Sequence, residues 1–409
     1  MKLLLLICTP SSLGFVAPWA HIRLFSDEQK LVHKQMKRSN DFKLLGFASI
    51  SSNAANAEEE NAIADQLEDP STHFLILPGF GNDLVDYTMP KSLVSTLASR
   101  AGKHHPHIQQ NHIHVLPVQR SEWLNVFTNG IVDPAFWASN MPPTSPSFRW
   151  YLQKIYQEVN RIVKEQVELK GRKEDDVKVV LLGHSAGGWL ARAAVGYGTI
   201  PTEPDREAYW KTLFRWFREE SNNSVSSEER RDVLRQVEVR EQQLALTHIA
   251  GIVTLGAPHL PPPQGVMDMT RGALRITNEK FPGAFHHPEI FYVTVAGNLI
   301  QGVQQQRNNF FEPTDVAGFA YESYSAVCGN GTALGDGVVP LEYSHLGDDF
   351  SIKIELPGVA HSINIPERWY GAEQVIDQWL EVVVDQLRQH WNLNQQARSR
   401  TASEESATA

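Results

Sequence analysis

The chain has little cysteine and lacks any long apolar run. Only Cys8 and Cys328 occur among its 409 residues. Cys8 falls in a predicted targeting segment, so the mature chain would hold one cysteine and no internal disulfide, which suits a reducing compartment. No run approaches the ~20 apolar residues that a membrane-spanning helix needs. A disulfide-stapled scaffold and a transmembrane protein are therefore not expected.

The chain also lacks an excess of basic charge. Its 47 acidic residues outnumber its 37 Lys and Arg, which gives a formal net charge of −10. Because nucleic-acid phosphates attract basic surfaces, this balance argues against a nucleic-acid partner, and it provides no general attraction to anionic lipid. The hydrophobic content of 42 % and the charged content of 21 % are ordinary for a soluble globular protein with a sizeable core.

The N-terminal segment has the layout of a targeting peptide. Lys2 and a short apolar run over residues 3–8 precede several small residues, as in a signal peptide. Phe15, within SSLGFVAP, resembles the cleavage motif of bipartite plastid-targeting signals, and the net-basic residues 16–45 resemble a transit peptide. We therefore expect residues 1–70 to be a targeting peptide and linker and the protein to reach a plastid. An ordinary secretory signal is the alternative.

The remaining pattern predicts one α/β domain. Apolar runs predict buried parallel strands over residues 72–80, 112–118, 177–182, 249–258, 290–297 and 351–358, and amphipathic patterns predict helices over 147–169 and 368–391. This alternation indicates a mostly parallel sheet with helices on both faces and a lid-like insertion. We expect the domain to cover residues 71–391, with insertions at about 200–246 and 298–334, and a disordered tail over 392–409.

The segment VVLLGHSAGGWLARAAV, residues 179–195, contains a G-x-S-x-G pattern centred on Ser185. An apolar strand precedes it and an Ala-rich helix follows, which is typical of a sharp turn that exposes a serine nucleophile. Gly183 and Gly187 are expected because a side chain at either position would collide across the turn. The helix N-terminus would favour developing negative charge. A glycine-rich turn without chemistry is the alternative interpretation.

A serine nucleophile needs a base, and the base needs an orienting acid. On such a turn the partners follow along the chain in the order Ser, acid, His. His361, just past the last predicted strand, is the expected base, and Asp336, between two glycines in LGDGVVP, is the expected acid. The alternatives are His345 and His390 for the base and Asp315, Asp348 and Asp349 for the acid.

Acyl transfer also needs two N–H donors for the oxyanion. Ala186, directly after Ser185, is expected to supply one backbone N–H. Phe80, between Gly79 and Gly81 in LPGFGND, is expected to supply the other, because glycines let the backbone approach a substrate closely. An ordinary turn is the alternative for this loop.

In this order, LPGFGND, GHSAGGWLAR, TLGAPH, GDGVVP and AHS resemble motifs of the α/β-hydrolase superfamily. More narrowly, VTLGAPHLPPPQGVMDMTRGAL and WYLQKIYQEV are similar to a plastid lipase-like branch related to GPI inositol-deacylases. The likeness covers residues 72–391. It implies an ester hydrolase with Ser185, Asp336 and His361 as its triad. Known GPI inositol-deacylases carry membrane spans, which this sequence lacks, and the insertion at 200–246 is longer than the family pattern.

Two further clusters have alternative interpretations. His104, His105, His107, His112 and His114 form either a histidine-rich surface loop or a metal site, and the absence of nearby Cys and acids favours the loop. Residues 209–218 place aromatic and apolar side chains on one helical face with basic neighbours. That pattern predicts a lid over the active site or peripheral membrane contact, and one helix can do both.

Together these motifs predict a serine hydrolase that cleaves acyl esters, with a lipid-like ester as substrate and no metal or organic cofactor. The same triad would also serve an acyltransferase or a thioesterase. A non-catalytic binding protein on the same fold is the alternative from another class.

Overall fold

A computed structural model describes residues 71–104, 108–201, 241–306 and 315–408. The predicted targeting peptide, the predicted helix at 209–218 and most of the charged insertion lie outside the described residues. Within the described part of the chain, no helix is both long and apolar enough to cross a membrane.

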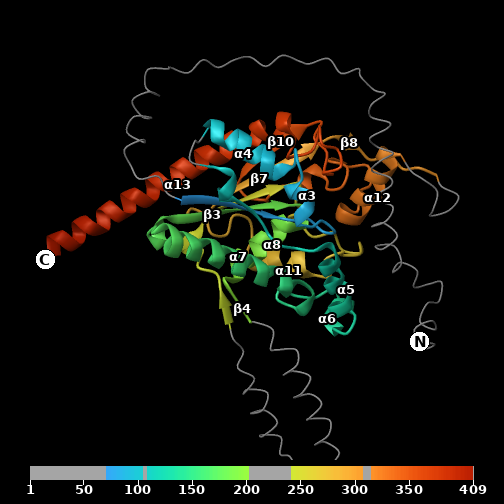
Figure 1. Cartoon of the computed structure of the whole chain (residues 1–409). Coiled ribbons are helices and arrows are strands. Elements are labelled where there is room, and N and C mark those ends of the chain that lie inside the picture. The colour runs from blue at the N-terminus through green and yellow to red at the C-terminus, as the bar shows by residue number, and fades with distance from the viewer. Residues whose placement is uncertain (1–70, 105–107, 202–240, 307–314, 409) are drawn as a thin grey trace, which may run out of the picture.

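A six-stranded sheet lies at the centre of the molecule, in the order β10-β7-β6-β3-β1-β2 (Figure 1). All neighbouring strands in it are parallel. Each strand coincides with a predicted apolar run, which confirms the α/β fold expected from the sequence. The strands are β1 (Ser71–Leu77), β2 (Ile113–Val115), β3 (Val177–His184), β6 (Ile249–Leu255), β7 (Phe291–Asn298) and β10 (Ile352–Pro357).

Helices cover both faces of this sheet (Figure 1). On one face lie α7 (Pro146–Lys170), α8 (Ala186–Tyr197) and α11 (Ala273–Lys280), and on the other lie α4 (Leu93–His104) and α13 (Glu373–Thr408). Two separate apolar cores result, one on each face. The predicted apolar stripe of α7 is buried at Phe148, Leu152, Ile155, Val159, Ile162 and Val163. The chain leaves α7 at Gly171, whose left-handed φ of 66° ends the helix.

Shorter elements form the connections. The helices are α3 (Leu84–Thr88), α5 (Asn125–Gly130), α6 (Pro134–Trp137) and α12 (Val316–Cys328). Single 3₁₀ turns cover Gln110–His112, Arg120–Leu124, Glu174–Asp176, Leu246–His248 and Leu341–Ser344. Two antiparallel pairs stand apart from the main sheet: β4 (Thr199–Pro201) with β5 (Glu241–Gln243), and β8 (Ile300–Gln301) with β9 (Leu334–Gly335).

The C-terminal helix is longer than expected. We predicted a helix over 368–391 and a disordered tail over 392–409, whereas α13 begins at Glu373 and continues to Thr408. Residues 372–409 contain no glycine or proline, so nothing in the tail interrupts the helix, although its residues are polar.

The register of the sheet sets where chemistry can occur. Leu77 pairs with Gly183 and His184 pairs with Leu255, so the carboxyl ends of β1, β3 and β6 meet at one edge. The connections α3, α5, α6 and α12 lie together on this side of the molecule, at the right of Figure 1.

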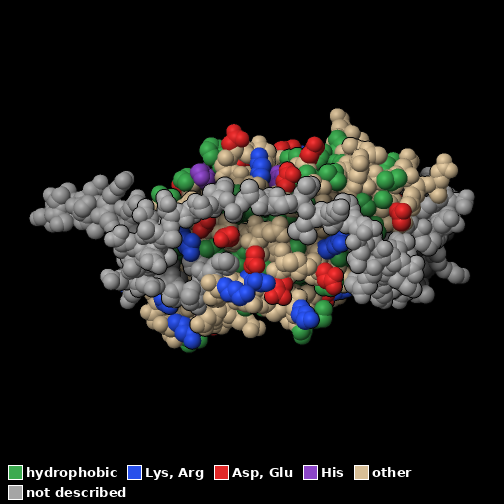
Figure 2. Space-filling view, turned by 90° about the horizontal axis from the view of Figure 1, so that it is seen from above, with side chains coloured by type: hydrophobic (Ala, Val, Ile, Leu, Met, Phe, Trp, Pro, Cys, Tyr) green, Lys and Arg blue, Asp and Glu red, His purple; other side chains and the backbone are tan. Residues whose placement is uncertain are grey.

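In the perpendicular view, basic and acidic side chains are interspersed over the exposed face (Figure 2).

Candidate active site

Ser185 forms the turn between β3 and α8. Its backbone has φ 52° and ψ −125°, a left-handed conformation that costs a non-glycine residue about 1–3 kcal/mol. Two hydrogen bonds hold this conformation: Ser185 N–H donates to Leu255 O over 3.0 Å, and Gly188 N–H donates to Ser185 O over 3.0 Å. The half-exposed serine side chain makes no capping bond to the helix. The strained turn therefore presents the hydroxyl instead of using it structurally.

Close backbone approach makes the surrounding glycines necessary. A Cβ on Gly187 would lie 2.2 Å from Leu77 O, and one on Gly183 would lie 2.4 Å from the Cα of Gly188. Both collisions confirm the sequence-based expectation for these two glycines. A Cβ on Gly79, in the loop after β1, would lie 2.8 Å from the Cβ of Ser185. The LPGFGND loop therefore lies directly against the serine.

Asp336 and His361 lie side by side although they belong to different loops. Nδ1 of His361 is 2.7 Å from Oδ2 of Asp336, and His361 N–H donates to Asp336 O over 2.9 Å. The other carboxylate oxygen, Oδ1, accepts N–H bonds from Val338 at 3.0 Å and Val339 at 2.8 Å. The Asp336 carboxylate can only accept a hydrogen bond, so a neutral His361 carries its proton on Nδ1. Its Nε2 is then free to accept a proton.

Asp336 is fully desolvated and still favours its charged form. Burial alone would raise the pKa of this carboxyl, but the His361 ring and the hydrogen bonds outweigh burial and hold the pKa below its ordinary value. A further donor is the hydroxyl of Tyr370, which lies 2.7 Å from Oδ2. An ionised carboxylate at this position stabilises positive charge on the neighbouring imidazole.

Four of the alternative bases and acids lie in other surroundings, and no contact among the described residues places the fifth, Asp349, at the site. His345 Nδ1 contacts Thr294 Oγ1 at 2.8 Å, and burial lowers the pKa of His345 to about 4. His390 lies on α13, where burial also lowers its pKa to about 4. Asp315 caps α12 and Asp348 accepts three backbone N–H bonds. None of these contacts joins an alternative residue to the Asp336–His361 pair.

The two predicted oxyanion donors are on adjacent segments. Ala186 begins α8, where the first backbone N–H groups have no partner within the helix. Phe80 is 39 % exposed, and its ring packs against Trp123 and Phe127 with centroid distances of 5.1 Å and 6.3 Å. Within the described chain no hydrogen bond occupies either N–H. The N–H of Gly79, by contrast, donates to the hydroxyl of Tyr87 over 3.1 Å.

Sequence reasoning missed three buried side chains around this site: Tyr87, Tyr370 and His184. The His184 ring lies 4.9 Å from the His361 ring between centroids, and its Nε2 is 3.1 Å from His361 O. The hydroxyls of Tyr87 and Tyr370 contact His184 and Asp336, respectively. The histidine could have been noticed within GHSAG, but neither tyrosine belongs to a recognisable motif.

The histidine-rich segment is partly described. His112 and His114 lie against the buried His73, whose Nδ1 is 3.0 Å from His114 Nε2. The guanidinium of Arg161 lies 3.2 Å from His114 Nδ1. No group of three or more His, Cys, Asp and Glu side chains suited to a metal ion occurs among the residues that the structure describes.

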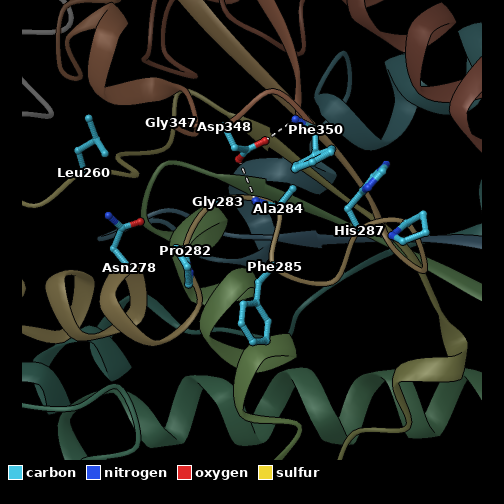
Figure 3. Close-up of a pocket in the computed structure, with 11 residues that line it drawn as sticks. Leu260, Asn278, Pro282, Gly283, Ala284, Phe285, His287, Gly347, Asp348 and Phe350 are labelled. Atoms are coloured by element: carbon cyan, nitrogen blue, oxygen red, sulfur yellow. Dashed lines mark hydrogen bonds between the residues drawn. The ribbon is translucent and has the colours of Figure 1, made fainter.

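A cavity of about 780 Å³ has a lining that includes none of Ser185, Asp336 and His361 (Figure 3). Its lining includes Phe285 and His287, which precede β7, and Asp348 and Phe350, which precede β10. These segments approach the amino ends of parallel strands, whereas Ser185 and His361 follow carboxyl ends. The dashed bonds in Figure 3 show that the Asp348 carboxylate is occupied by the N–H groups of Ala284 and Phe350. This cavity is separate from the candidate active site.

No protein-family model matches the chain, and no curated protein matches its sequence. Remote similarity to solved structures is found. The mature form of lipase BlEst2 from Bacillus licheniformis is 12 % identical, with 78 % of this chain and 92 % of that chain covered and a TM-score of 0.36. The Staphylococcus hyicus lipase is 13 % identical, with 80 % of this chain and 98 % of that chain covered and a TM-score of 0.40. Lipase 1 from Pelosinus fermentans is 10 % identical, with 77 % of this chain and 98 % of that chain covered and a TM-score of 0.34.

The fold class follows from the chain's own geometry. A parallel sheet with helices on both faces carries a strained serine between β3 and α8, and an aspartate and a histidine follow later in the chain. That sequence of elements, with Ser before Asp before His, is the arrangement of the α/β-hydrolase fold. The chain has this fold.

Proposed function

We propose that this protein is a serine hydrolase that cleaves carboxylic esters through Ser185, His361 and Asp336. The observation that carries the proposal is the 2.7 Å contact between His361 Nδ1 and Asp336 Oδ2, beside a nucleophile turn with φ 52°. A glycine-rich turn without chemistry would require neither a strained serine nor a buried, oriented imidazole nearby.

Acylation would begin when Ser185 Oγ attacks the ester carbonyl carbon and His361 Nε2 takes the hydroxyl proton. The carbonyl electron pair moves to the oxygen, which the backbone N–H groups of Phe80 and Ala186 stabilise. The tetrahedral intermediate then collapses, and the alcohol leaves with the proton held by His361. Asp336 holds His361 in the correct tautomer and stabilises the imidazolium throughout.

Deacylation would repeat these steps with water. His361 removes a proton from water, whose oxygen attacks the acyl carbon, and Ser185 leaves with the proton returned to Oγ. The products are a carboxylic acid and an alcohol. This sequence requires the side chains and backbone donors already named, so we propose no metal or organic cofactor.

We propose a lipid-like acyl ester as the substrate. Large apolar side chains are exposed on the connections that follow β1, β2 and β6, on the edge where Ser185 lies. They include Met89, Val132, Trp137, Met267 and Met269, with exposed fractions of 51 %, 82 %, 57 %, 49 % and 47 %. Exposed apolar surface at the edge of the sheet that carries the proposed nucleophile favours a substrate with long hydrocarbon chains. The resemblance to the plastid lipase-like branch favours the same class.

The decisive experiment compares the wild-type chain from about residue 60 onward with Ser185→Ala. We expect the wild type to hydrolyse a panel of acyl esters and to form a covalent adduct with a fluorophosphonate at Ser185. Ser185→Ala should fold normally and lose both properties. A matched control is Ser95→Ala on α4, which removes a half-buried hydroxyl that bonds to Ser92 O. Unchanged turnover in Ser185→Ala would overturn the proposal.

Product analysis refines the reaction class. With water as acceptor, the acyl group should appear as free acid even when glycerol or another alcohol is present. Predominant transfer to the alcohol would identify an acyltransferase instead. Faster cleavage of thioesters than of matched oxygen esters would identify a thioesterase.

We also propose that residues 1–70 direct the protein to a plastid, because their charge and apolar pattern resembles a bipartite targeting signal. Fusion of this segment to a fluorescent protein in an alga with a multi-membrane plastid tests the proposal. Secretion of the fusion would contradict it.

A further inference from the structure

A continuous path of hydrogen bonds runs behind the nucleophile turn. Gly79 N–H donates to the hydroxyl of Tyr87 over 3.1 Å, and that hydroxyl is 2.8 Å from His184 Nδ1. At the other side of the imidazole, His184 Nε2 is 3.1 Å from the carbonyl oxygen of His361. This relay, defined as Gly79, Tyr87, His184 and His361, connects three separate segments of the candidate active site.

The direction of every proton in this relay follows from one acceptor. The carbonyl of His361 can only accept, so His184 Nε2 must carry the proton. Nδ1 of a neutral His184 then has no proton, so the Tyr87 hydroxyl must donate to it. The Tyr87 oxygen is left as the acceptor for Gly79 N–H. Each donor therefore has one acceptor, and the relay has a single consistent arrangement.

Burial keeps the relay in this arrangement. Tyr87 is 0 % exposed and His184 is 2 % exposed. Burial, together with the nearby His361, lowers the pKa of His184 to about 3, so its imidazole is neutral at physiological pH. A charged His184 would place a cation beside the His361 ring, 4.9 Å away between centroids, where it would oppose the imidazolium that forms on the proposed base. Trp369 packs edge-on against both Tyr87 and His184 and restrains their rings further.

The three connected segments are those whose relative position decides the rate. Gly79 precedes Phe80, the proposed oxyanion donor, and its N–H is anchored by Tyr87. His184 precedes Ser185, the proposed nucleophile. His361 is the proposed base, and its own backbone is held by His184. Misplacement of reacting groups by about 1 Å can reduce a rate on the order of 100-fold.

Resting on the proposed ester hydrolysis, we propose that Tyr87 and His184 are positioning residues that hold the oxyanion loop and the base in register around Ser185. Neither side chain has to touch the substrate, because each acts through the backbone that it anchors. The analogous tyrosine on the acid side, Tyr370, accepts Gly297 N–H and donates to Asp336, so tyrosines anchor the site from two directions.

The first test is Tyr87→Phe, which removes one hydroxyl from the relay. We expect kcat per fluorophosphonate-titrated site to fall on the order of 10- to 100-fold with KM nearly unchanged. The matched control is Tyr156→Phe on α7. Tyr156 is equally buried, and its hydroxyl donates one 2.7 Å bond to Ala194 O. This control should lose thermal stability but retain its kcat per titrated site.

Two substitutions at His184 test the two hydrogen bonds of its imidazole separately. His184→Asn retains an acceptor close to the position of Nδ1, and His184→Gln retains a donor close to the position of Nε2. Each variant breaks one link, so each should lower kcat. The double variant Tyr87→Phe/His184→Asn should fall little below the slower single variant, because both changes interrupt one path.

Nuclear magnetic resonance of ¹⁵N-labelled histidine reports the protonation state and tautomer of His184 without requiring catalysis. His184 should be neutral with its proton on Nε2 at pH 7, and Tyr87→Phe should shift its Nδ1 signal. A different tautomer, or a kcat per titrated site in Tyr87→Phe equal to that of Tyr156→Phe, would overturn the positioning role. A wild type that cleaves no ester would instead contradict the proposed function itself, while the ¹⁵N signals would still show whether the relay exists.

Discussion

The hydroxyl of Tyr370 donates to Asp336 Oδ2 over 2.7 Å, the same oxygen that His361 Nδ1 contacts at 2.7 Å. One carboxylate oxygen thus serves two donors, and the other accepts two backbone N–H groups. Four donors fix the carboxylate plane, and the plane fixes the imidazole. The orientation of the proposed base is therefore set by residues that lie far from Ser185 in the sequence.

Tyr370→Phe should reduce kcat about 10-fold while the chain remains folded. The variant removes one donor from Asp336, so the pKa of this carboxyl should rise, and it leaves Gly297 N–H without its 2.7 Å acceptor. A lost hydrogen bond to a charged group costs about 1.5–3 kcal/mol, which appears partly in stability and partly in the barrier. Steady-state kinetics measure the part that appears in the barrier, and thermal unfolding measures the part that appears in stability. The half-exposed Tyr343 offers the control Tyr343→Phe, which should leave kcat unchanged.

Asp336→Asn should reduce kcat about 10⁴-fold, because an amide no longer holds His361 in the tautomer that leaves Nε2 free to accept. Fluorophosphonate labelling of Ser185 should slow in parallel. Asp348→Asn is an informative comparison, since that half-buried carboxylate accepts hydrogen bonds from the backbone N–H groups of Ala284, Phe350 and Ser351. It should lower the melting temperature and leave kcat near the wild-type value. Equal kinetic losses in both variants would contradict the acid assignment.

Gly187→Ala should destabilise the fold by about 3 kcal/mol, because the added Cβ would meet Leu77 O at 2.2 Å and neither backbone segment can move freely. Gly347→Ala is its counterpart, since a Cβ there meets nothing within 4 Å and the backbone φ lies outside the left-handed region. Chemical denaturation of both variants measures the difference in the free energy of unfolding. If Gly187→Ala were as stable as Gly347→Ala, the close packing of β1 on the turn would be wrong.

Local patterns predicted the sheet and the sharp turn at Ser185 well, because both depend on neighbours in sequence. Apolar runs identified all six strands of the sheet, and the spacing of Gly183 and Gly187 around Ser185 identified the turn that joins β3 to α8. Asp336 and His361 were predicted from their order in the chain and their places beside turn residues and a strand end. The structure brings this pair into contact.

The roles of Tyr87 and Tyr370 could not be predicted, because their contacts join segments far apart in the sequence. The bond from Tyr87 to His184 spans 97 residues, and the bond from Tyr370 to Asp336 spans 34. A single buried tyrosine has no periodic pattern that distinguishes a polar anchor from an ordinary core residue. The pairing of β4 with β5 was missed for a similar reason, since two three-residue strands leave almost no pattern.

Acidification should destabilise the protein below about pH 6.5. Burial, aided by neighbouring positive charge, lowers the pKa of His73 and of His184 to about 3, whereas histidine in an unfolded chain has a pKa near 6.5. Between these values the unfolded state binds more protons than the folded state, so the free energy of unfolding falls as the pH falls. Above pH 6.5 neither state is protonated and the contribution is constant.

The expected size of this loss is on the order of 2 kcal/mol for each of the two histidines at pH 5, from about 1.4 kcal/mol per pH unit. Urea denaturation at pH 8, 7, 6 and 5 measures it directly. His73→Gln removes one of the titrating groups but retains polar atoms near Ser71 and His114. The variant should be less stable than the wild type at pH 8. The difference between their free energies of unfolding should narrow by about 2 kcal/mol at pH 5, because only the wild type loses the contribution of His73. A difference that stays constant across this range would show that His73 takes up its proton equally readily in the folded and unfolded states, which its complete burial and its two hydrogen bonds argue against.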